Sequence, residues 1–490
     1  MKMTVRLLSP SIDPVFKNAP DSKWDDRFSD LEMEHILNIM SRDSEELSDI
    51  CRQVMDLSLS SSDEIIYRQD ILKDFLAQPE VARKIYQTCL DARENKRGIW
   101  LNLSSPYLST IYSSAAHLLK IYMEALVKIR KILEEHTFTS AGLRRFSATL
   151  SEELSDEYLD QLRDLEDGIA EKNGILISSG FGSFLQGVSY VKLQKEKGLS
   201  RLQWLVHPSY TIAEQDTTGS KDLEFRRDRA INEVANAMAQ AADNLENFTN
   251  TLRMELGFYV GALNLHDQFQ QFFLPVCFPS FSTSSSRSWE NLYDGSLALL
   301  KGGPVVGNSL EIVDTMHCLI TGANQGGKTT FLRSVGQCQL MAQCGLFVCA
   351  DRCTIPVNTS IYTHFKREED SKMDSGKLDE ELERMSKIID GLSSGSLLLS
   401  NESFSSTNDV DGSKILGQIT QALLEKNIEV FTVTHLINYA MTYSENQNTL
   451  CLRAERMPDG TRTFKLVVGK PLKTAFGEDI FQKIFHPKES

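Results

Sequence analysis

The sequence predicts a multidomain protein whose helical N-terminal part carries a small β-rich insertion and is followed by a C-terminal α/β domain. Up to about residue 290, long stretches place apolar residues three and four positions apart, which is the period of a helix. Residues 174–212 differ, because short apolar runs there surround a glycine-rich stretch, as in strands joined by turns. Beyond a loop rich in proline and serine at 275–288, apolar strands alternate with helical stretches, which is typical of a parallel sheet covered by helices.

The helical part is predicted to contain short and long helices. Residues 25–100 predict several short ones, with Pro79 at a turn between two of them. One long helix is predicted for residues 107–136, which contain no proline or glycine. A second runs from Asp222 to about Phe273. A helix of about 50 residues would be on the order of 75 Å long, too long for a compact domain, so we interpret it as an arm.

The predicted arm can be interpreted as one continuous helix or as several shorter ones. Its sequence also fits two or three helices with breaks at Gly257 and Gly261. The stripe that one continuous helix would place on a single side consists of Ile231, Val234, Met238, Ala241 and Leu245.

The C-terminal domain is predicted to contain four apolar strands and a hairpin. The hairpin consists of NTLCLRAER and TRTFKLVV, joined at the turn formed by Pro458, Asp459 and Gly460. The four strands are HCLIT (317–321), LFVCA (346–350), SLLLS (396–400) and EVFTVT (429–434).

Length and composition indicate a globular protein of the cytoplasm. A chain of 490 residues is too long for one core and suggests roughly two to four domains. No apolar run approaches the roughly 20 residues that span a bilayer, and Asp13 and Pro14 interrupt the start before a signal-peptide core could form. We therefore expect no membrane partner. The nine cysteines form no C-x-x-C pair, which favours incidental thiols in a reducing compartment over zinc ligands.

The overall charge limits how the protein could bind nucleic acid. A net charge of −15 argues against coating nucleic acid by charge alone, although it leaves room for a local basic surface. Runs of basic residues also occur on solvated helix faces that bind nothing. Two basic stretches are candidates for DNA contact: Lys192, Lys195, Lys197 and Arg201, and then Arg226, Arg227 and Arg229.

The segment GANQGGKT at 322–329 matches the phosphate-binding pattern G-x-x-x-x-G-K-[ST], or P-loop. It follows a predicted strand and opens a predicted helix, as the pattern requires. Glycines allow successive backbone N–H groups to surround phosphate oxygens, and the helix N-terminus adds partial positive charge. Lys328 would reach the β- and γ-phosphates, and the Thr329 hydroxyl would ligate Mg²⁺. The predicted ATP–Mg²⁺ site comprises Gly322, Ala323, Asn324, Gln325, Gly326, Gly327, Lys328, Thr329 and Thr330.

Two further strand ends carry residues suited to hydrolysis. Phosphoryl transfer to water needs a metal-supporting residue and a carboxylate that orients the water. Asn401 and Glu402 follow a buried-type strand some 70 residues after the P-loop, and we assign them these two roles. The amide of Asn401 would hold Mg²⁺ less strongly than a carboxylate. His435 follows the next strand, where it could sense the γ-phosphate, although a lone histidine is more often a packed or solvated residue.

These three elements, in this order, resemble the ATPase domain of the MutS family. The family's P-loop, G-P-N-M-G-G-K-S/T, and its later stretch, L-L-D-E-[IL]-G-R-G-T-S-T-x-D-G, both have counterparts here. The segment 305–309 resembles the family's V-P-N-D, 475–477 resembles S-Y-G, and 67–76 is similar to a core segment. The matching residues are Gly322, Asn324, Gly326, Gly327, Lys328 and Thr329, then Leu398, Leu399, Glu402, Thr407, Asp411 and Gly412, and finally Thr434 and His435.

The resemblance implies a domain layout and a function. It implies a helical core segment (1–105), a long-helix lever with a β-rich clamp insertion near 174–212 (106–290), and an ABC-type P-loop ATPase domain (291–490). The expected function is ATP-dependent DNA binding in repair or recombination, with slow hydrolysis driving a conformational switch. The expected assembly is a homodimer in which Ser375 approaches the partner's nucleotide.

Departures from the family pattern qualify these expectations. The family's N-terminal mismatch-reading domain, with its Phe-x-Glu wedge, has no counterpart in this sequence, so we expect no recognition of single mismatches. Asn401 replaces the family's aspartate, and Gly376 replaces a threonine beside Ser375. Only about ten residues follow Ile480, which leaves little room for the family's C-terminal dimerising helices.

Two other functions fit parts of the sequence. The first is a nucleotide-binding scaffold with little or no hydrolysis, which Asn401 favours. The second is a generic P-loop enzyme, such as a kinase or the ATPase subunit of a transporter. The absence of an L-S-G-G-Q signature, together with some 300 residues of mostly helical sequence before the P-loop, disfavours the second.

Overall fold

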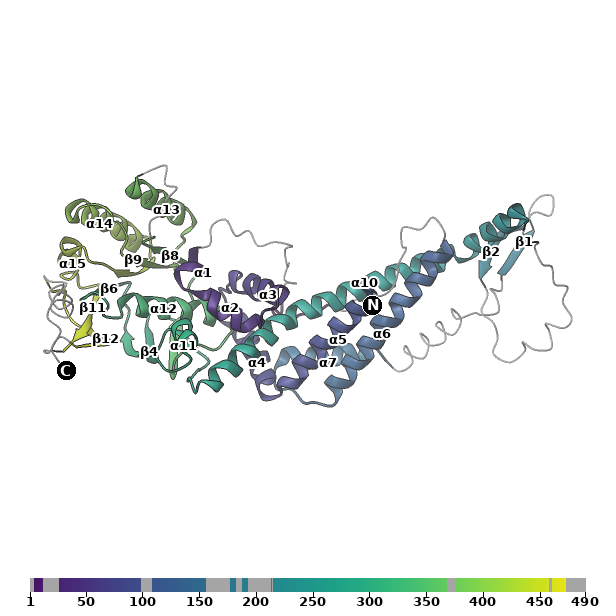
Figure 1. Cartoon of the computed structure of the whole chain (residues 1–490), viewed down its shortest axis with the longest axis horizontal. Helices are drawn as coiled ribbons and strands as arrows, with labels where there is room; N and C mark the ends of the chain where they lie inside the picture. The colour runs from purple at the N-terminus through teal and green to yellow at the C-terminus, as the bar shows by residue number, and fades with distance from the viewer. Residues whose placement is uncertain are drawn as a thin grey trace, which may run out of the picture. The chain divides into compact units, whose positions relative to one another are not determined.

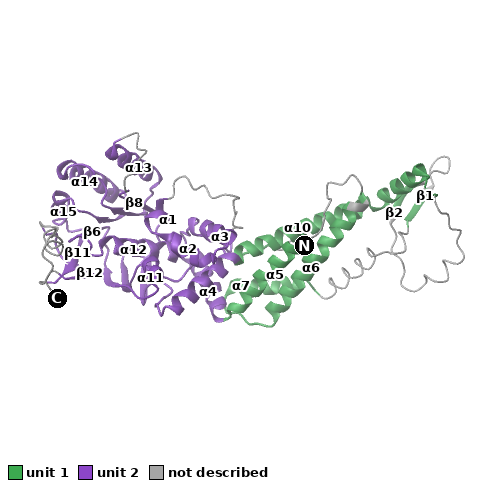
Figure 2. Ribbon diagram, viewed as in Figure 1, with its two compact units in different colours: residues 1–7, 78–256 green, residues 8–77, 257–490 purple. Residues whose placement is uncertain are grey.

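Figure 1 shows the computed structural model of the chain, which describes residues 4–11, 26–97, 108–155, 177–181, 187–192, 213, 215–367, 376–457 and 461–472. The chain forms two compact units (Figure 2). Unit 1 comprises Met1–Leu7 and Gln78–Leu256, and unit 2 comprises Leu8–Ala77 and Gly257–Ser490. The three-domain division by residue range stays a prediction.

Unit 1 is built from long helices. They are α5 (Pro79–Arg97), α6 (Leu108–Glu134), α7 (Ala141–Glu153) and the larger part of α10 (Thr217–Gln271). Proline at the first helical position suits the start of α5, and Pro79 does separate two helices, as predicted. The side chain of Ser140 accepts a hydrogen bond from the Leu143 N–H and so caps α7. No helix of the described ranges is long and apolar enough to cross a membrane.

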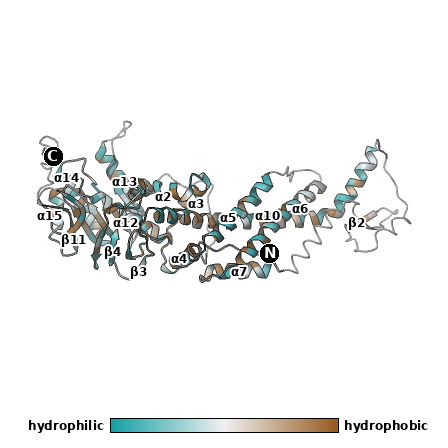
Figure 3. Ribbon diagram, turned by 60° about the horizontal axis from the view of Figure 1, so that its bottom comes forward, coloured by the Kyte–Doolittle hydropathy of each residue, from teal (hydrophilic) through white to brown (hydrophobic). Residues whose placement is uncertain are grey.

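The predicted arm is one continuous helix of 55 residues, α10. Of its expected stripe, Ile231 is fully buried against Tyr112 of α6, with Val234 and Met238 packed beside it. Figure 3 shows hydrophobic and hydrophilic residues alternating along α10. The alternative with breaks at glycines is wrong, because those glycines serve close packing in unit 2. A Cβ on Gly261 would lie 2.5 Å from the Cys51 sulfur.

A short antiparallel pair of strands lies inside the predicted β-rich insertion. Strand β1 (Ile177–Phe181) pairs with β2 (Gly187–Lys192), with an irregular register between Ser178 and Gly180. The insertion therefore contains β-structure as predicted. Its other predicted runs, LQWLV and SYTI, lie outside the described residues.

Unit 2 begins with short helices, as the periodicity predicted. They are α1 (Asp26–Asp30), α2 (Met33–Ser41), α3 (Glu45–Asp56) and α4 (Ser62–Ala77). Two glutamines of α12 (Lys328–Gln343) tie this segment to the later part of unit 2. Gln337 donates to the Leu31 carbonyl at 2.9 Å, and Gln343 donates to the Leu59 carbonyl at 2.8 Å. These bonds satisfy one buried and one partly buried carbonyl and join the two chain segments within unit 2.

The main sheet of unit 2 has six strands in the order β12-β11-β6-β10-β9-β8. All neighbouring pairs are parallel except the predicted hairpin β11–β12. In Figure 1, α13 (Lys377–Gly391) and α14 (Asp409–Glu425) lie above the sheet and α12 lies below it. The strands are β6 (His317–Thr321), β8 (Ile361–Phe365), β9 (Leu397–Asn401), β10 (Glu429–Val433), β11 (Thr449–Arg456) and β12 (Arg462–Val468).

The parallel register explains how distant residues meet. Val433 of β10 lies opposite Ile320 of β6 on one side and Asn401 of β9 on the other. Because parallel strands share one carboxyl edge, the residues that follow β6, β9 and β10 meet there. The three strand ends selected in the sequence therefore form one site.

A second sheet, with the order β3-β7-β4-β5, was not predicted. It contains β3 (Ser280–Ser282) and β4 (Arg287–Leu292), so residues 275–288 are not only a loop. Helix α11 (Gly295–Lys301) precedes β5 (Asn308–Ile312), and β7 is Arg352–Pro356. A buried ion pair connects the sheets: Arg287 Nε donates to Glu429 Oε1 at 2.6 Å.

The predicted strand at 346–350 is wrong. Only Val348 pairs, in an isolated bridge with Cys277. All five residues of 346–350 are nevertheless buried. A short apolar run signals burial, and burial alone does not distinguish a strand from an interior loop.

Candidate nucleotide-binding site

The P-loop connects β6 to α12, and its glycines are required by the backbone. Gly322 and Gly327 have φ values of 119° and 87°, which L side chains rarely adopt. A Cβ on Gly326 would also lie 2.7 Å from the Ala454 side chain of β11. The loop is therefore shaped by positive φ and by the close approach of the neighbouring strand.

The N-terminus of α12 faces the site without a side-chain cap. Gly327 occupies the N-cap position and has no side chain to accept from the first-turn N–H groups. The helix dipole adds partial positive charge at the same point. An uncapped N-terminus beside a glycine-rich loop suits a bound anion.

Lys328 lies inside the loop with neutral partners. Its Nζ donates to the Gly322 and Ala323 carbonyl oxygens, each at 3.0 Å, and the residue is 5% exposed. Burial lowers the pKa of Lys328 to about 8, and the positive charge of Arg462 lowers it further, whereas Glu402 acts in the opposite direction. The ammonium group is thus held by carbonyl dipoles, and no carboxylate among the described residues contacts it directly.

This pKa predicts that phosphate binding weakens at high pH. Below about pH 8 the Lys328 side chain is charged in the protein without ligand. Above about pH 8 it progressively loses its proton, and the free energy of regaining that proton on phosphate binding lowers the affinity. From about pH 7.5 to about pH 9.5 we expect ATP affinity to fall roughly 20-fold. Calorimetry across this range checks it, with Lys328→Arg as the control, because an arginine stays charged and its profile should be flat. Parallel profiles for the two proteins would contradict the prediction.

Thr329 and Asn401 bring two oxygen atoms together at the sheet edge. The Thr329 hydroxyl donates to the Asn401 Oδ1 at 3.1 Å, which joins the first turn of α12 to the end of β9. Hydroxyl and amide oxygens suit a hard cation such as Mg²⁺, and neither brings a negative charge. The pair therefore fits a metal that takes the rest of its ligands from phosphate and water.

Glu402 and His435 form a hydrogen-bonded pair beside this oxygen pair. The His435 Nε2 lies 2.8 Å from the Glu402 Oε1, and both side chains are 29% exposed. The hydrogen bond from His435 lowers the pKa of Glu402 below its usual value. Glu402 has a φ of 54°, and its N–H donates to the Val433 carbonyl at 2.8 Å. The strand end therefore holds an ionised carboxylate in a conformation that a non-glycine residue seldom adopts.

Sequence reasoning missed Asp409, which secures the loop after His435. The Asp409 carboxylate accepts from the Ile437 N–H at 2.7 Å, at the start of α15 (Ile437–Tyr443). Ser413 accepts from the Tyr439 N–H at 3.0 Å. An aspartate in the first turn of a helix usually stabilises its own helix, so the sequence carried no signal for this second contact.

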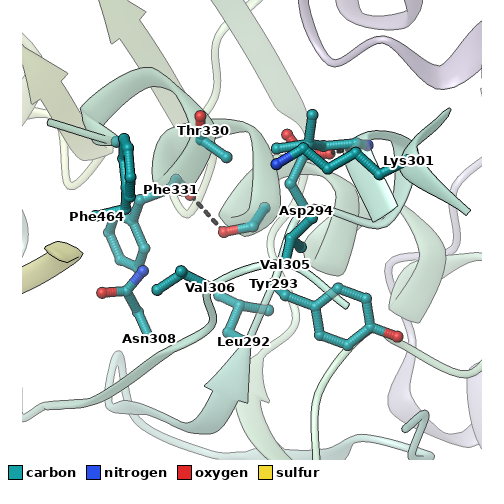
Figure 4. Close-up of a pocket in the computed structure, with 13 residues that line it drawn as sticks. Leu292, Tyr293, Asp294, Lys301, Val305, Val306, Asn308, Thr330, Phe331 and Phe464 are labelled. Carbon is teal, nitrogen blue, oxygen red and sulfur yellow. Dashed lines mark hydrogen bonds between the residues drawn. The ribbon is translucent and has the colours of Figure 1, made fainter. Parts of the chain in front are cut away.

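A pocket of about 160 Å³ lies beside the P-loop (Figure 4). Phe464 of β12 and Val306 line it, together with Gly327 and Thr330 of the P-loop region. Asn308 also lines it, and the sequence pointed to this residue only through the resemblance at 305–309. A phenylalanine in a hairpin strand suggests packing, which is why Phe464 was missed.

The structure brings the P-loop together with Asn401, Glu402 and His435, whereas the remaining candidate residues are elsewhere or not described. Arg226 on α10 pairs with Asp222 at 2.7 Å, and the Arg229 guanidinium lies 5.3 Å from the Phe225 ring centroid. Arg227 is exposed on the same helix. The backbone of Lys192 belongs to β2, and its side chain is not described. Ser375, Lys195, Lys197 and Arg201 lie outside the described residues, as do 475–477.

Two family models match this chain in order. The MutS2 N-terminal domain matches residues 60–272, and MutS domain V matches residues 318–489. The second match begins in β6 and includes the P-loop, Asn401, Glu402 and His435. The helical part and the site are thus matched independently.

Curated relatives carry the same family names. The chain is 24% identical over 366 residues to Endonuclease MutS2 of Clostridioides difficile (strain 630), covering 67% of this chain and 45% of the relative. It is 24% identical over 363 residues to Endonuclease MutS2 of Alkaliphilus oremlandii, covering 66% and 44%. It is 27% identical over 184 residues to the DNA mismatch repair protein MutS of a Thermus thermophilus strain, covering 38% and 23%. These matches span less than half the length of each relative. Together with the two family models and the convergent strand ends, they establish that the chain belongs to the MutS family.

Proposed function

We propose that unit 2 binds ATP and Mg²⁺ and hydrolyses ATP slowly. The contact of 3.1 Å between Thr329 and Asn401 carries the proposal, because it brings together two oxygen atoms of the kinds that suit Mg²⁺ next to the P-loop. The backbone of 322–327 would surround the phosphates, and Lys328 would add its charge. The pocket lined by Phe464 and Val306 would bind the adenine base of ATP, since aromatic and aliphatic side chains pack well against the flat faces of a base.

The hydrolytic step is assigned to Glu402 and His435. Held ionised by His435, Glu402 would accept a hydrogen bond from the attacking water and orient it. When bound, Mg²⁺ supplies charge neutralisation at the phosphates. His435 would also sense the nucleotide. A ligand that breaks the contact between His435 and Glu402 would release one of the contacts that hold the loop leading into α15. The Asp409 contact would transmit that change to α14.

Asn401→Asp tests the proposed metal position. A carboxylate is the stronger ligand for a hard cation, so we expect the Mg²⁺ concentration for half-maximal ATP binding to fall about tenfold, equivalent to ~1.4 kcal/mol. Fluorescent-ATP titrations at graded Mg²⁺ concentrations measure it. Asn446→Asp, the same change in an exposed turn, is the matched control and should have no effect. An unchanged metal dependence in Asn401→Asp would remove Asn401 from the metal site.

The DNA-binding part of the proposal rests on unit 1 and on family membership. We propose that the protein binds DNA through Lys192, Lys195, Lys197, Arg201, Arg226, Arg227 and Arg229 and that ATP changes its grip. The curated relatives are named as an endonuclease and as DNA mismatch repair proteins. The basic residues of α10 are interspersed with acidic ones, so few phosphate contacts are expected and base sequence should matter little.

Gel-shift titrations on duplex, branched, single-stranded and singly mismatched DNA test this proposal. The slope of log K against log salt is about −0.9 per phosphate contact, so replacing Arg226, Arg227 and Arg229 with glutamine should reduce its magnitude by up to about 2.7. Preferential binding of one mispair would refute the expectation that single mismatches are not recognised. Failure to bind any of these DNAs at low salt would favour the scaffold, which the neutral Asn401 amide also supports.

The remaining expectations about assembly and location are also proposals. A homodimer in which Ser375 reaches the partner's nucleotide predicts that ATP promotes self-association and that Ser375→Ala lowers turnover but not ATP affinity. Sedimentation with ATP and with ADP tests this, and a fully active monomer in both would exclude it. A cytoplasmic location is proposed on the composition alone.

A further inference from the structure

The hairpin strand β12 brings a second cation to the P-loop. Arg462, the first residue of β12, has its Nη1 3.5 Å from the side-chain oxygen of Gln325 in the loop. The Arg462 side chain is half-buried. Within the part of the chain that the structure describes, Arg462 forms no ion pair. A guanidinium carries five N–H donors, and among the described residues the contact with Gln325 involves only one nitrogen of this group.

The nearby carboxylates are committed to other groups. Glu455 on the facing strand β11 accepts from the Thr463 hydroxyl at 2.7 Å. Glu402 is bound by His435. The positive charge of Arg462 helps to lower the pKa of Lys328, so the two cations interact. Glu402 offsets part of this effect at Lys328, but two cations at one loop still raise the local potential and favour a negatively charged ligand.

The backbone fixes β12 against the loop. The β11–β12 register shifts between the pairs Ala454–Leu466 and Arg456–Arg462, which marks a bulge. Phe464 lies in this bulge with a φ of 59°, and a Cβ on Gly327 would lie 3.0 Å from the Phe464 carbonyl oxygen. A bulge changes the direction of the side chains around it. The bulge lies in β12, the strand whose Phe464 lines the pocket and whose Arg462 lies near Gln325 of the P-loop.

We propose that Arg462 is a second phosphate-binding residue, which binds the phosphates of the nucleotide together with Lys328. The proposal rests on the proposed nucleotide site and adds a contact supplied by a strand outside the P-loop. A guanidinium can donate two parallel hydrogen bonds to one phosphate, which the ammonium of a lysine cannot do. Arg462 would therefore select for ligands with several phosphate charges.

Titrations of the full chain with ATP and with tripolyphosphate, which has no base, test Arg462. Arg462→Gln should weaken both ligands by about tenfold, equivalent to ~1.4 kcal/mol. Arg462→Lys should lose less, because it keeps the charge. The matched control is Lys465→Gln, which removes the same charge from an exposed residue of the same strand and should leave both affinities unchanged. Thermal unfolding of each variant confirms that the proteins are folded.

Each other outcome overturns the proposal in an identifiable way. Equal losses in Lys465→Gln and Arg462→Gln would indicate a general effect of charge. A loss for ATP but not for tripolyphosphate would indicate that the change acts through the base pocket. Unchanged affinities in Arg462→Gln, with Lys328→Ala still defective, would exclude Arg462 and leave the nucleotide site intact. Failure of the unaltered protein to bind ATP would exclude both.

Discussion

Lys328→Ala is expected to lower ATP affinity by about 100-fold or more, equivalent to ~2.7 kcal/mol, because a charge-assisted contact to phosphate is removed. The ammonium of Lys328 is already directed into the loop by the Gly322 and Ala323 carbonyls, so little rearrangement precedes binding. The alanine variant loses this charge, and those two carbonyls then face any bound phosphate without an intervening cation. Isothermal calorimetry with ATP and with ADP measures the loss.

The control for this experiment is Lys426→Ala. Lys426 is exposed at the C-terminal end of α14, so its removal changes the net charge equally without altering the loop. It should bind ATP as the unaltered protein does. If folded Lys328→Ala bound ATP with unchanged affinity, the P-loop would not be the nucleotide site.

The second large effect is expected for Glu402→Gln, which should keep ATP affinity and lose turnover by roughly 10²–10⁴-fold. The amide of glutamine has the same shape and can still accept from the His435 Nε2, so the loop should remain in place. It cannot accept a proton from water or stabilise one that is leaving. Single-turnover hydrolysis with saturating ATP measures the step itself.

Glu445→Gln provides the matched control, since Glu445 is exposed and pairs only with Lys470 among the described residues. Its turnover should be unchanged. Normal turnover in Glu402→Gln would assign the water-orienting role to another residue. An unaltered protein that binds ATP but shows no turnover would support the scaffold alternative instead.

The P-loop and the strand ends could be predicted because chemistry dictates their residue types. Phosphate binding needs glycines with positive φ and a lysine, and Gly322, Gly327 and Lys328 lie at the required spacing. The meeting of Asn401 with Thr329 followed from the rule that parallel strands share a carboxyl edge. Long helices such as α6 and α10 were equally predictable, because many successive turns repeat one pattern.

The pocket beside the P-loop, the position of Arg462 and the second sheet could not be predicted, for three different physical reasons. The pocket is formed by segments far apart in the chain, and only the fold brings Phe464 to Val306. The position of Arg462 depends on a register shift in β11–β12 that no local pattern signals. Strand β3 has three residues, too few to establish a period of two. The buried loop at 346–350 shows the converse error, in which apolar content suggests a strand that is not there.

The division of unit 2 between two chain segments affects how the protein is made. The helices of residues 8–77 leave the ribosome first, and the side chains that donate to the Leu31 and Leu59 carbonyls come from α12, far along the chain. Gln337 and Gln343 lie 306 and 284 residues after their acceptors, so synthesis at ~5–20 residues per second delays them by on the order of 15–60 s. During that interval unit 1 can fold as an inserted domain, whereas α1 to α4 must stay soluble with their apolar faces uncovered. We therefore expect the nascent chain to expose apolar helix faces, which chaperones bind, until the P-loop helix has been synthesised.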